Sequence, residues 1–299
     1  KDYVAHSLKY KKHPIKRFKI VIDTANAMGG PVCKEFFSKF DADIIHLFPD
    51  LDGRFPNHEA NPLKEENLEA LKKEVIKQKA DLGIVVDPDV DRLAFVCEDG
   101  TFFGEEYTLV AVADYVLSKT PGNTVSNLSS TRALRDVTEK YGKKYTASAV
   151  GEVNVVEAMK KTKAVIGGEG NGGIIYPAAH YGRDALMGIA LFLSHLARNG
   201  KKASELRKTY PDYFMAKKKI ELKPGMNADA VLKHLEQKYA HEKINTTDGV
   251  KIDFEHAREW VHLRKSNTEP IIRIYSESTT QPAADALAEK IINEIRALV

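Results

Sequence analysis

The sequence lacks the features that mark secreted, membrane-spanning and nucleic-acid-binding proteins. Its 299 residues include only two cysteines, Cys33 and Cys97, so no disulfide framework is available and a reducing compartment, the cytoplasm, is expected. No apolar run reaches the roughly 18 residues that cross a bilayer, so we expect no membrane partner. The net charge is +3 and the basic clusters are short, which predicts no nucleic-acid partner.

The sequence also lacks an initiator methionine. It begins at Lys1 with a polar, basic stretch, so we expect a fragment or a processed form in which residues 1–13 are a linker. The remaining composition, 43% hydrophobic and 29% charged, is typical of a globular protein. The length suggests two or three domains.

The order of the predicted helices and strands divides the chain into three domains. Residues 14–104 alternate strands and helices, and residues 105–214 repeat this rhythm. Residues 215–299 instead combine several strands with two helices. The predicted fold class is therefore α/β, with two α/β domains that have mixed sheets, followed by a C-terminal α+β domain with an antiparallel sheet.

Three alternating carboxylates follow a short apolar run, Leu82–Val86, that reads as a buried strand. They belong to Asp87, Asp89 and Asp91. Carboxylates this close repel one another and raise each other's pKa, and a hard cation such as Mg²⁺ removes that penalty because its ligands are oxygens. Ligands of open α/β sheets also collect at the carboxyl ends of strands. The pattern predicts a magnesium loop, and a solvated acidic turn is the simpler alternative.

Two other families place aspartates at similar spacing. An EF-hand loop needs glycine at its sixth position, where Arg92 stands, so we reject it. A haloacid-dehalogenase-type phosphatase would use Asp87 as nucleophile and Asp89 as acid. That family has threonine or valine where this sequence has Asp91, and we keep it as an alternative.

A glycine-rich segment, Gly167–Gly173, follows another predicted strand, Ala164–Gly167. Its glycines surround Glu169 and Asn171 and let the backbone approach a ligand closely. A carboxylate and an amide at alternate positions suit the vicinal hydroxyls of a sugar, which both donate and accept hydrogen bonds. A flexible turn is the alternative. His58, alone in an irregular loop, is expected at the surface.

A third loop, Arg264–Pro270, lies between two predicted strands and reads RKSNTEP. It combines a guanidinium, two hydroxyls and an amide, and Arg273 follows shortly after. Such groups match the oxygens of a phosphate, which arginine can bind through two parallel hydrogen bonds. A plain hairpin turn is the alternative. Together the three loops predict a sugar-phosphate site in a common cleft where the domains meet.

The three motifs resemble those of the α-D-phosphohexomutases. The resemblance rests on DPDVDR at Asp87–Arg92, GEGNGG at Gly168–Gly173 and RKSNTEP at Arg264–Pro270, in the family's order, and it extends over nearly all of the 299 residues. It implies a four-domain enzyme and a reversible phosphoryl transfer between C1 and C6 of a hexose phosphate. A phosphoserine would donate the phosphoryl group to the substrate.

The resemblance also implies roles for individual residues. The three aspartates would hold Mg²⁺, which bridges to the phosphoserine, and Arg92 would contact the transferring phosphoryl group. Glu169 and Asn171 would orient the sugar hydroxyls. The phosphate that is not reacting would be held by Arg264, Ser266, Asn267 and Thr268.

The sequence departs from the family in two places. No Ser-His-Asn motif occurs in it, so we expect domains two to four only, no activity from this chain alone, and a need for the N-terminal domain of the same protein. Second, Gly173 stands where many members have a proton-transferring histidine. Arg183 and His180 are the candidates for that role.

The form of the glycine-rich segment, with IIYPAAHYGRDAL after it, is most similar to the phosphoglucosamine mutase and phosphomannomutase branch of the family. The expected substrate is a glucosamine phosphate, and phosphomannomutase/phosphoglucomutase activity is the alternative. A further alternative from another class is a non-catalytic module that binds sugar phosphates.

Overall fold

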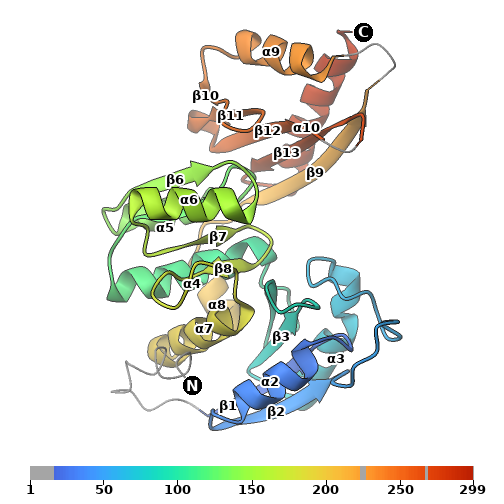
Figure 1. Cartoon of the computed structure of the whole chain (residues 1–299), viewed down its shortest axis with the longest axis vertical. Coiled ribbons are helices and arrows are strands. Elements are labelled where there is room, and N and C mark those ends of the chain that lie inside the picture. Colours follow the sequence, from blue (N-terminus) through green and yellow to red (C-terminus); the bar gives the residue numbers. More distant parts are fainter. Residues whose placement is uncertain (1–16, 223–226, 267–268, 299) are drawn as a thin grey trace. The chain divides into compact units, whose positions relative to one another are not determined.

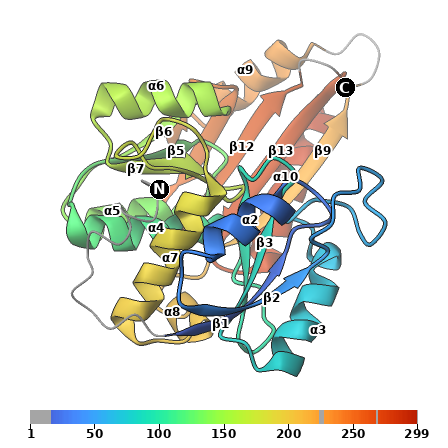
Figure 2. The ribbon, with the colours of Figure 1, turned by 60° about the horizontal axis from the view of Figure 1, so that its bottom comes forward.

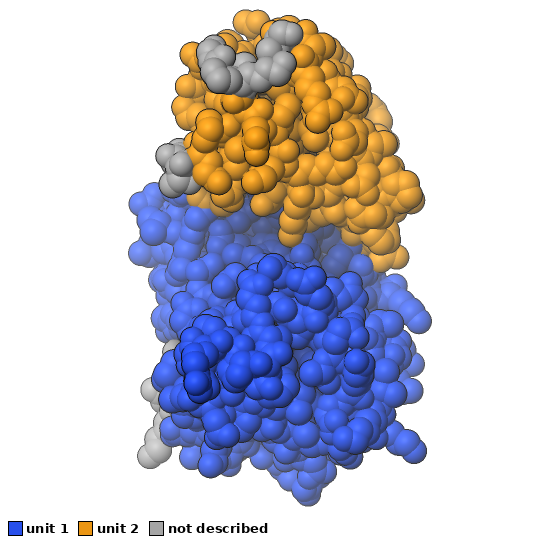
Figure 3. All heavy atoms as spheres, turned by 90° about the vertical axis from the view of Figure 1, so that its right-hand side faces the viewer, with its two compact units in different colours: residues 1–147, 151–210 blue, residues 148–150, 211–299 orange. Residues whose placement is uncertain are grey.

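The computed structural model describes residues 17–222, 227–266 and 269–298. The chain forms two compact units (Figure 3). Unit 1 comprises residues 1–147 and 151–210, and unit 2 comprises residues 148–150 and 211–299. In the described part of the chain, no helix is both long enough and apolar enough to cross a membrane.

The first sheet of unit 1 has the strand order β2-β1-β3-β4, and Figure 1 labels β1, β2 and β3. The two neighbours of β1 are parallel to it, whereas β4 runs antiparallel to β3. The strands are β1 (Phe18–Asp23), β2 (Ala42–Leu47), β3 (Leu82–Val86) and β4 (Leu93–Cys97). β3 and β4 are buried at every position, as their continuous apolar sequences predict for strands that are covered on both faces.

Helices cover both faces of this sheet (Figure 2). α3 (Glu69–Gln78), which follows the 3₁₀ turn η2 (Glu65–Leu68), packs Leu71 and Val75 against Val85 and its neighbours. α2 (Gly29–Phe37) lies on the other face, because Gly29 is close to Val86, whose side chain points opposite to that of Val85. Both faces of β3 are therefore shielded from water, and the polar side chains follow at the carboxyl end of the strand.

The second sheet of unit 1 has the order β6-β5-β7-β8, with β5 parallel to β7 and β8 antiparallel to β7. Its strands are β5 (Thr124–Asn127), β6 (Tyr145–Ser148), β7 (Ile166–Glu169) and β8 (Gly173–Ile175). The helices between them are α4 (Glu105–Lys119), α5 (Ala133–Lys140) and α6 (Glu152–Thr162). Val155 and Met159 of α6 pack against Val125 of the sheet.

α7 (Ala185–Asn199) connects the two sheets of unit 1, and the short α8 (Ala203–Arg207) follows it. Phe192 of α7 stacks on Phe95 of β4 with ring centroids 3.9 Å apart. At Gly188 of α7, an added Cβ would lie 2.7 Å from Leu93 of β4 and 3.1 Å from Ile174 of β8. The two sheets therefore share one helix and one core.

Unit 2 is a five-stranded antiparallel sheet in the order β10-β11-β12-β13-β9. Its strands are β9 (Phe214–Glu221), β10 (Lys243–Asn245), β11 (Val250–Phe254), β12 (Glu259–Lys265) and β13 (Ile271–Ser278), with the 3₁₀ turn η3 (Glu255–Ala257). Two helices, α9 (Ala228–Lys238) and α10 (Gln281–Arg296), supply Leu235 and Ile291 to its core. Unit 2 thus builds its apolar core from its own sheet and its own two helices.

The predicted fold class is confirmed, since two mixed sheets with helices precede a C-terminal antiparallel sheet. One predicted strand is displaced: β7 extends to Glu169 instead of ending at Gly167, because Gly168 and Glu169 pair with β8. The short elements β8, α8 and β10 were not predicted. The division at residues 13, 104 and 214 stays a prediction.

Candidate functional site

The acidic loop begins where β3 ends. Asp87 is fully buried, and its Oδ1 accepts hydrogen bonds from the backbone amides of Asp91 and Arg92, both at 2.9 Å. Its Oδ2 is 2.6 Å from Nε of Arg92. These bonds curl the loop back on itself, so that oxygens of Asp87, Asp89 and Asp91 lie within 4.8 Å of one another.

The loop concentrates negative charge. Burial raises the pKa of Asp91 to about 7, and the neighbouring Asp87 adds to the effect. Burial acts in the same direction on Asp87, but hydrogen bonds from the backbone and guanidinium of Arg92 outweigh it and lower the pKa of Asp87. Asp89 is exposed and has no hydrogen bond or ion pair with a described residue. The carboxylate oxygens of the loop converge, and those of Asp89 have no partner among the described residues. Such an arrangement fits a hard divalent cation.

The glycine-rich segment lies at the turn between β7 and β8. Glu169 is 5% exposed, and its Oε1 accepts hydrogen bonds from Nδ2 of Asn127 at 2.8 Å and from the amide of Gly151 at 3.2 Å. Its Oε2 accepts from Nη1 of Arg183 at 3.1 Å and from Nδ2 of Asn171 at 3.4 Å. The carboxylate that the sequence placed in the glycine-rich segment after a strand is therefore the last residue of β7.

The acidic loop and the glycine-rich segment lie against each other. The amide of Leu93 donates to the carbonyl of Gly172 at 3.2 Å, and Arg92 forms a β-bridge with Gly173. Gly172 has φ +81°, and an added Cβ would lie 2.1 Å from the carbonyl oxygen of Leu93. The amide of Ala185, at the start of α7, donates to the carbonyl of Val90. Two of the three predicted loops are thus brought together within unit 1.

Of the two candidates for proton transfer, Arg183 lies between these loops. Its guanidinium forms ion pairs with Asp91, with Glu152 at 3.2 Å and with Glu169 at 3.1 Å. His180 is 41% exposed at its side chain and is 2.8 Å from Asp184, the N-cap of α7. The roles in proton transfer stay predictions.

Sequence reasoning missed the loop that follows β5. The hydroxyl of Ser130 accepts a hydrogen bond from the amide of Gly170 at 2.9 Å and donates to Oδ1 of Asn127 at 3.0 Å. Asn127 in turn holds Glu169. The sequence signal that could have identified this loop is the run of polar residues after β5. Because β5 is parallel to β7, its carboxyl end lies beside the end of β7, where the glycine-rich motif begins.

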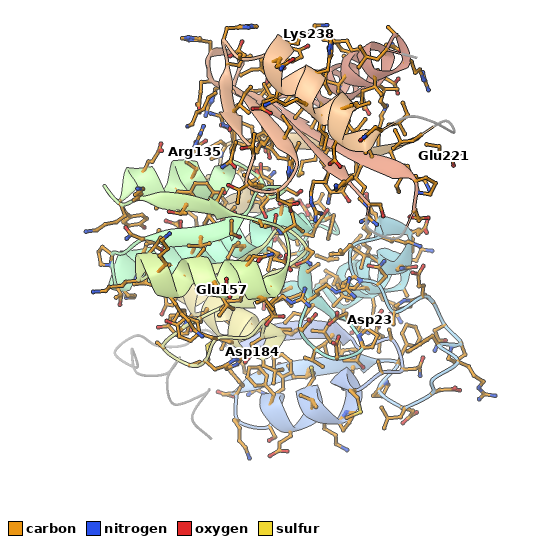
Figure 4. The ribbon with its side chains drawn as sticks, turned by 45° about the horizontal axis from the view of Figure 1, so that its top comes forward. Asp23, Arg135, Glu157, Asp184, Glu221 and Lys238 are labelled. Atoms are coloured by element: carbon orange, nitrogen blue, oxygen red, sulfur yellow. The ribbon has the colours of Figure 1, made fainter. Side chains whose placement is uncertain are left out.

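The expectation that His58 is a surface residue is wrong, because its side chain is only 12% exposed and contacts Asp23. Asp23 is the last residue of β1 (Figure 4). Nε2 of His58 is 3.0 Å from Oδ2 of Asp23, and Nδ1 is 2.8 Å from the carbonyl of Glu59. A carbonyl and an ionised carboxylate both accept hydrogen bonds, so these contacts favour the doubly protonated ring. The hydrogen bond to Asp23 raises the pKa of His58.

In unit 2, the phosphate-loop prediction covers the turn between β12 and β13. Nε of Arg264 is 2.7 Å from Oδ2 of Asp248, and the amide of Ser266 donates to the carbonyl of Ile271 at 3.0 Å. Asn267 and Thr268 lie outside the described residues. Arg264 is thus held at the edge of the loop in which the sequence placed it.

Strand register in unit 2 adds two cations beside Arg264. Arg273 lies opposite Arg264, and Lys219 lies opposite Arg273. Neither the side chain of Arg273 nor that of Lys219 has an ion pair or hydrogen bond with a described residue. Like charges at opposed positions destabilise a sheet unless a counter-ion offsets them, which suits a bound anion. A cleft shared by this loop and those of unit 1 stays a prediction.

Three family models match this chain in sequence order. They are described as phosphoglucomutase/phosphomannomutase alpha/beta/alpha domain II, at residues 1–100, domain III, at residues 104–213, and C-terminal domain, at residues 217–294. Together they extend over most of the chain. The chain therefore belongs to the phosphoglucomutase/phosphomannomutase family.

Individual relatives agree with this assignment. A "Phosphoglucomutase/phosphomannomutase" of Thermococcus kodakarensis is 35% identical over 89% of this chain and 58% of its own length. A "Probable phosphoglucosamine mutase" of Methanopyrus kandleri is 32% identical over 94% of this chain and 62% of its own length. A crystal structure of a family protein from Burkholderia thailandensis has a TM-score of 0.84 and 26% identity over 98% of this chain and 63% of that one. The chain spans about three fifths of these relatives.

Family membership removes the haloacid-dehalogenase-type alternative. In the structure, Oδ1 of Asp87 accepts from the amides of Asp91 and Arg92 and Oδ2 accepts from Nε of Arg92, so these bonds orient the carboxylate within the loop. The buried carboxylate that opens the acidic loop is part of the loop's scaffold.

Proposed function

We propose that this chain provides the metal, sugar and phosphate sites of a phosphohexomutase, an enzyme that transfers a phosphoryl group between C1 and C6 of a hexose phosphate. The observation that carries the proposal is the junction in unit 1, where Arg183 pairs with both Asp91 of the acidic loop and Glu169 of the glycine-rich segment. A cation site and a hydroxyl-binding carboxylate at one place are what this transfer requires.

The cation in this proposal is Mg²⁺, held by Asp87, Asp89 and Asp91. When bound, it would neutralise charge on the phosphoryl group during transfer. Arg92 is anchored through Nε by Asp87, and its side chain is 30% exposed, so its guanidinium is oriented and still reachable. We infer that it contacts the transferring phosphoryl group. In unit 2, Arg264 and Ser266 would hold the other phosphate.

The preferred substrate in this proposal is a glucosamine phosphate, which the name of the Methanopyrus relative supports. Mannose and glucose phosphates are the alternative, which the name of the Thermococcus relative supports. Specificity constants for the three hexose 6-phosphates, measured with a protein that also carries a phosphoserine domain, decide between them.

The metal site is tested by one variant with a matched control. Asp89→Asn removes a ligand charge without removing any hydrogen bond within the described residues, and we expect it to weaken Mn²⁺ binding at least about tenfold. Free Mn²⁺ can be measured by electron paramagnetic resonance. Asp50→Asn, another exposed carboxylate of unit 1, should leave the affinity unchanged. Equal affinities for both variants and the wild type would contradict the assignment.

The second test concerns catalysis. We propose that the phosphoserine comes from the N-terminal domain of the same protein, so this chain alone should show no mutase activity with Mg²⁺ and a hexose bisphosphate. Addition of a domain that carries a Ser-His-Asn loop should restore turnover. Sugar-phosphate binding without turnover in that mixture would favour the binding-module alternative.

A further inference from the structure

Glu169 has no vacant acceptor position in the structure. A carboxylate offers about four lone pairs, two on each oxygen. Asn127 and the amide of Gly151 occupy Oε1, and Arg183 and Asn171 occupy Oε2. A sugar hydroxyl can therefore donate to Glu169 only after one of these donors leaves.

Oε2 is the oxygen that can be vacated. Both donors to Oε1 are built into secondary structure, because Asn127 ends β5 and Gly151 is the N-cap of α6. The donors to Oε2 are side chains on loops. Asn171, at 3.4 Å, is a weak donor whose displacement costs little, whereas Arg183, at 3.1 Å, holds Oε2 through a charge-assisted hydrogen bond, so the displacement of Arg183 is the one that changes affinity.

Arg183 is seated among three carboxylates from three segments. They are Asp91 of the acidic loop, Glu152 at the start of α6 and Glu169 at the end of β7. Its backbone amide also donates to Glu152 at 3.2 Å. The side chain is 21% exposed, so it is largely desolvated but has a path to solvent.

Gly173 makes room for this seat. An added Cβ at Gly173 would lie 2.5 Å from Cδ of Arg183. The absence of a side chain at Gly173 therefore leaves the space through which Arg183 reaches Asp91 and Glu169.

We infer that Arg183 is a positioning residue that acts as a latch: it pairs at once with Oε2 of Glu169, the proposed acceptor of a sugar hydroxyl, and with Oδ2 of Asp91, a proposed cation ligand, and it leaves both when the site fills. The inference rests on the proposed function and deepens it. The latch links two ligands of different chemistry, a divalent cation and a hexose phosphate.

Such a latch couples the two ligands. Each ligand must displace the same side chain, so whichever binds first bears the cost of displacement and the second binds to a site that is already open. Because such coupling is reciprocal, the cation tightens sugar-phosphate binding by the factor by which the sugar phosphate tightens cation binding.

The experiment measures Mn²⁺ binding by electron paramagnetic resonance, at mildly alkaline pH, with and without saturating glucose 6-phosphate. For the wild type we expect the sugar phosphate to tighten Mn²⁺ binding at least about fivefold. For Arg183→Met without sugar we expect Mn²⁺ to bind about tenfold more tightly than to the wild type, because a competing positive charge is gone. The coupling factor of this variant should fall towards one.

Two further variants control the result. Arg198→Met removes an exposed arginine at the other end of α7 and should behave as the wild type. Gly173→Ala keeps the guanidinium but crowds its seat, and it should shift Mn²⁺ affinity and coupling in the same direction as Arg183→Met. It therefore tests the latch even if Arg183→Met does not fold.

Mn²⁺ affinity that is unchanged or weaker in both Arg183→Met and Gly173→Ala would overturn the latch, as would coupling of wild-type size in both. In either case the wild type would still bind both ligands, and the proposed function would stand. A wild type that binds neither Mn²⁺ nor glucose 6-phosphate would overturn the proposed function and the latch with it.

Discussion

Asp87, Asp89 and Asp91 have the same side chain in three different environments. Asp87 is buried, and its oxygens accept hydrogen bonds from the backbone and a side chain of the loop itself. Asp91 is partly buried beside it, and Asp89 is exposed. The three alternating aspartates therefore differ in role: Asp87 holds the loop together, Asp91 pairs with Arg183, and Asp89 has no side-chain partner among the described residues. Substitutions at the three positions should therefore differ in their effects on folding.

His58 and Asp23 give a pH-dependent contribution to stability. The pKa of His58 is raised in the folded protein by its hydrogen bond to Asp23, so the pair stabilises the fold fully below the unfolded-state histidine pKa of about 6.5. The contribution is lost as the pH rises through the folded-state pKa. We expect the free energy of unfolding to fall between mildly acidic and mildly alkaline pH.

The variant that isolates this effect is His58→Gln. Loss of the cation leaves Asp23 buried with a hydrogen bond from the amide of Ala25, and we expect about 3 kcal/mol of destabilisation at acidic pH. The difference from the wild type should shrink as the pH rises, as measured by urea unfolding. A difference that does not depend on pH would show that His58 acts only through packing.

At the scale of elements, the carboxyl ends of strands carry the site. The acidic loop follows β3, and β7 ends in Glu169. Strand interiors are apolar because both faces are covered, so polar side chains that face a ligand are confined to the ends. The turn from β7 to β8 then brings the second sheet against the start of β4.

This junction between elements depends on Gly172. Gly172→Ala would place a Cβ 2.1 Å from the carbonyl of Leu93 in a backbone with φ +81°. We expect a loss of at least about 2 kcal/mol in the free energy of unfolding, because strain and a backbone clash add. The measurement is urea unfolding of the purified variant.

Gly142→Ala is the matched control. Gly142 also has a positive φ, +66°, but nothing lies within 4 Å of an added Cβ there. It should lose only about 1 kcal/mol, the usual cost of a left-handed alanine. Equal losses at the two positions would mean that the backbone conformation alone matters and that the contact with Leu93 does not.

At the scale of the whole molecule, unit 2 and the first sheet of unit 1 differ in whether their own residues complete their cores. Unit 2 has a core of its own between its sheet and its two helices. The first sheet of unit 1 instead depends on Phe192 of α7, which stacks on Phe95. We expect residues 211–299 to fold cooperatively when expressed alone, and residues 17–104 to fail, since they would expose Phe95 and its neighbours.

Dispersed amide resonances and a cooperative thermal transition are the measurements. Residues 17–210 serve as the control and should fold, because they retain both sheets and the shared helix. A stable, cooperatively folded 17–104 fragment would instead support the sequence-based division at residue 104.

The sequence by itself determined the class of fold, nearly all of the helices and strands, and the three motifs. These depend on local information, namely apolar periodicity, glycines at turns and polar residues directly after a buried run. The acidic loop is the clearest case, because a strand and its terminal carboxylates are adjacent in the chain. β3, which precedes this loop, was predicted with its observed bounds, whereas β7, which ends in Glu169, was predicted but is displaced along the chain.

Only the tertiary structure decided which side chains share a site. The partner of Asp23 is 35 residues away, and those of Arg183 come from the acidic loop, α6 and β7. No local pattern encodes these pairs, because they depend on which segments pack against each other and on the space that Gly173 leaves. Interactions between residues close in the sequence determined which side chains stand at the strand ends. Packing between distant segments determined which of these side chains contact one another.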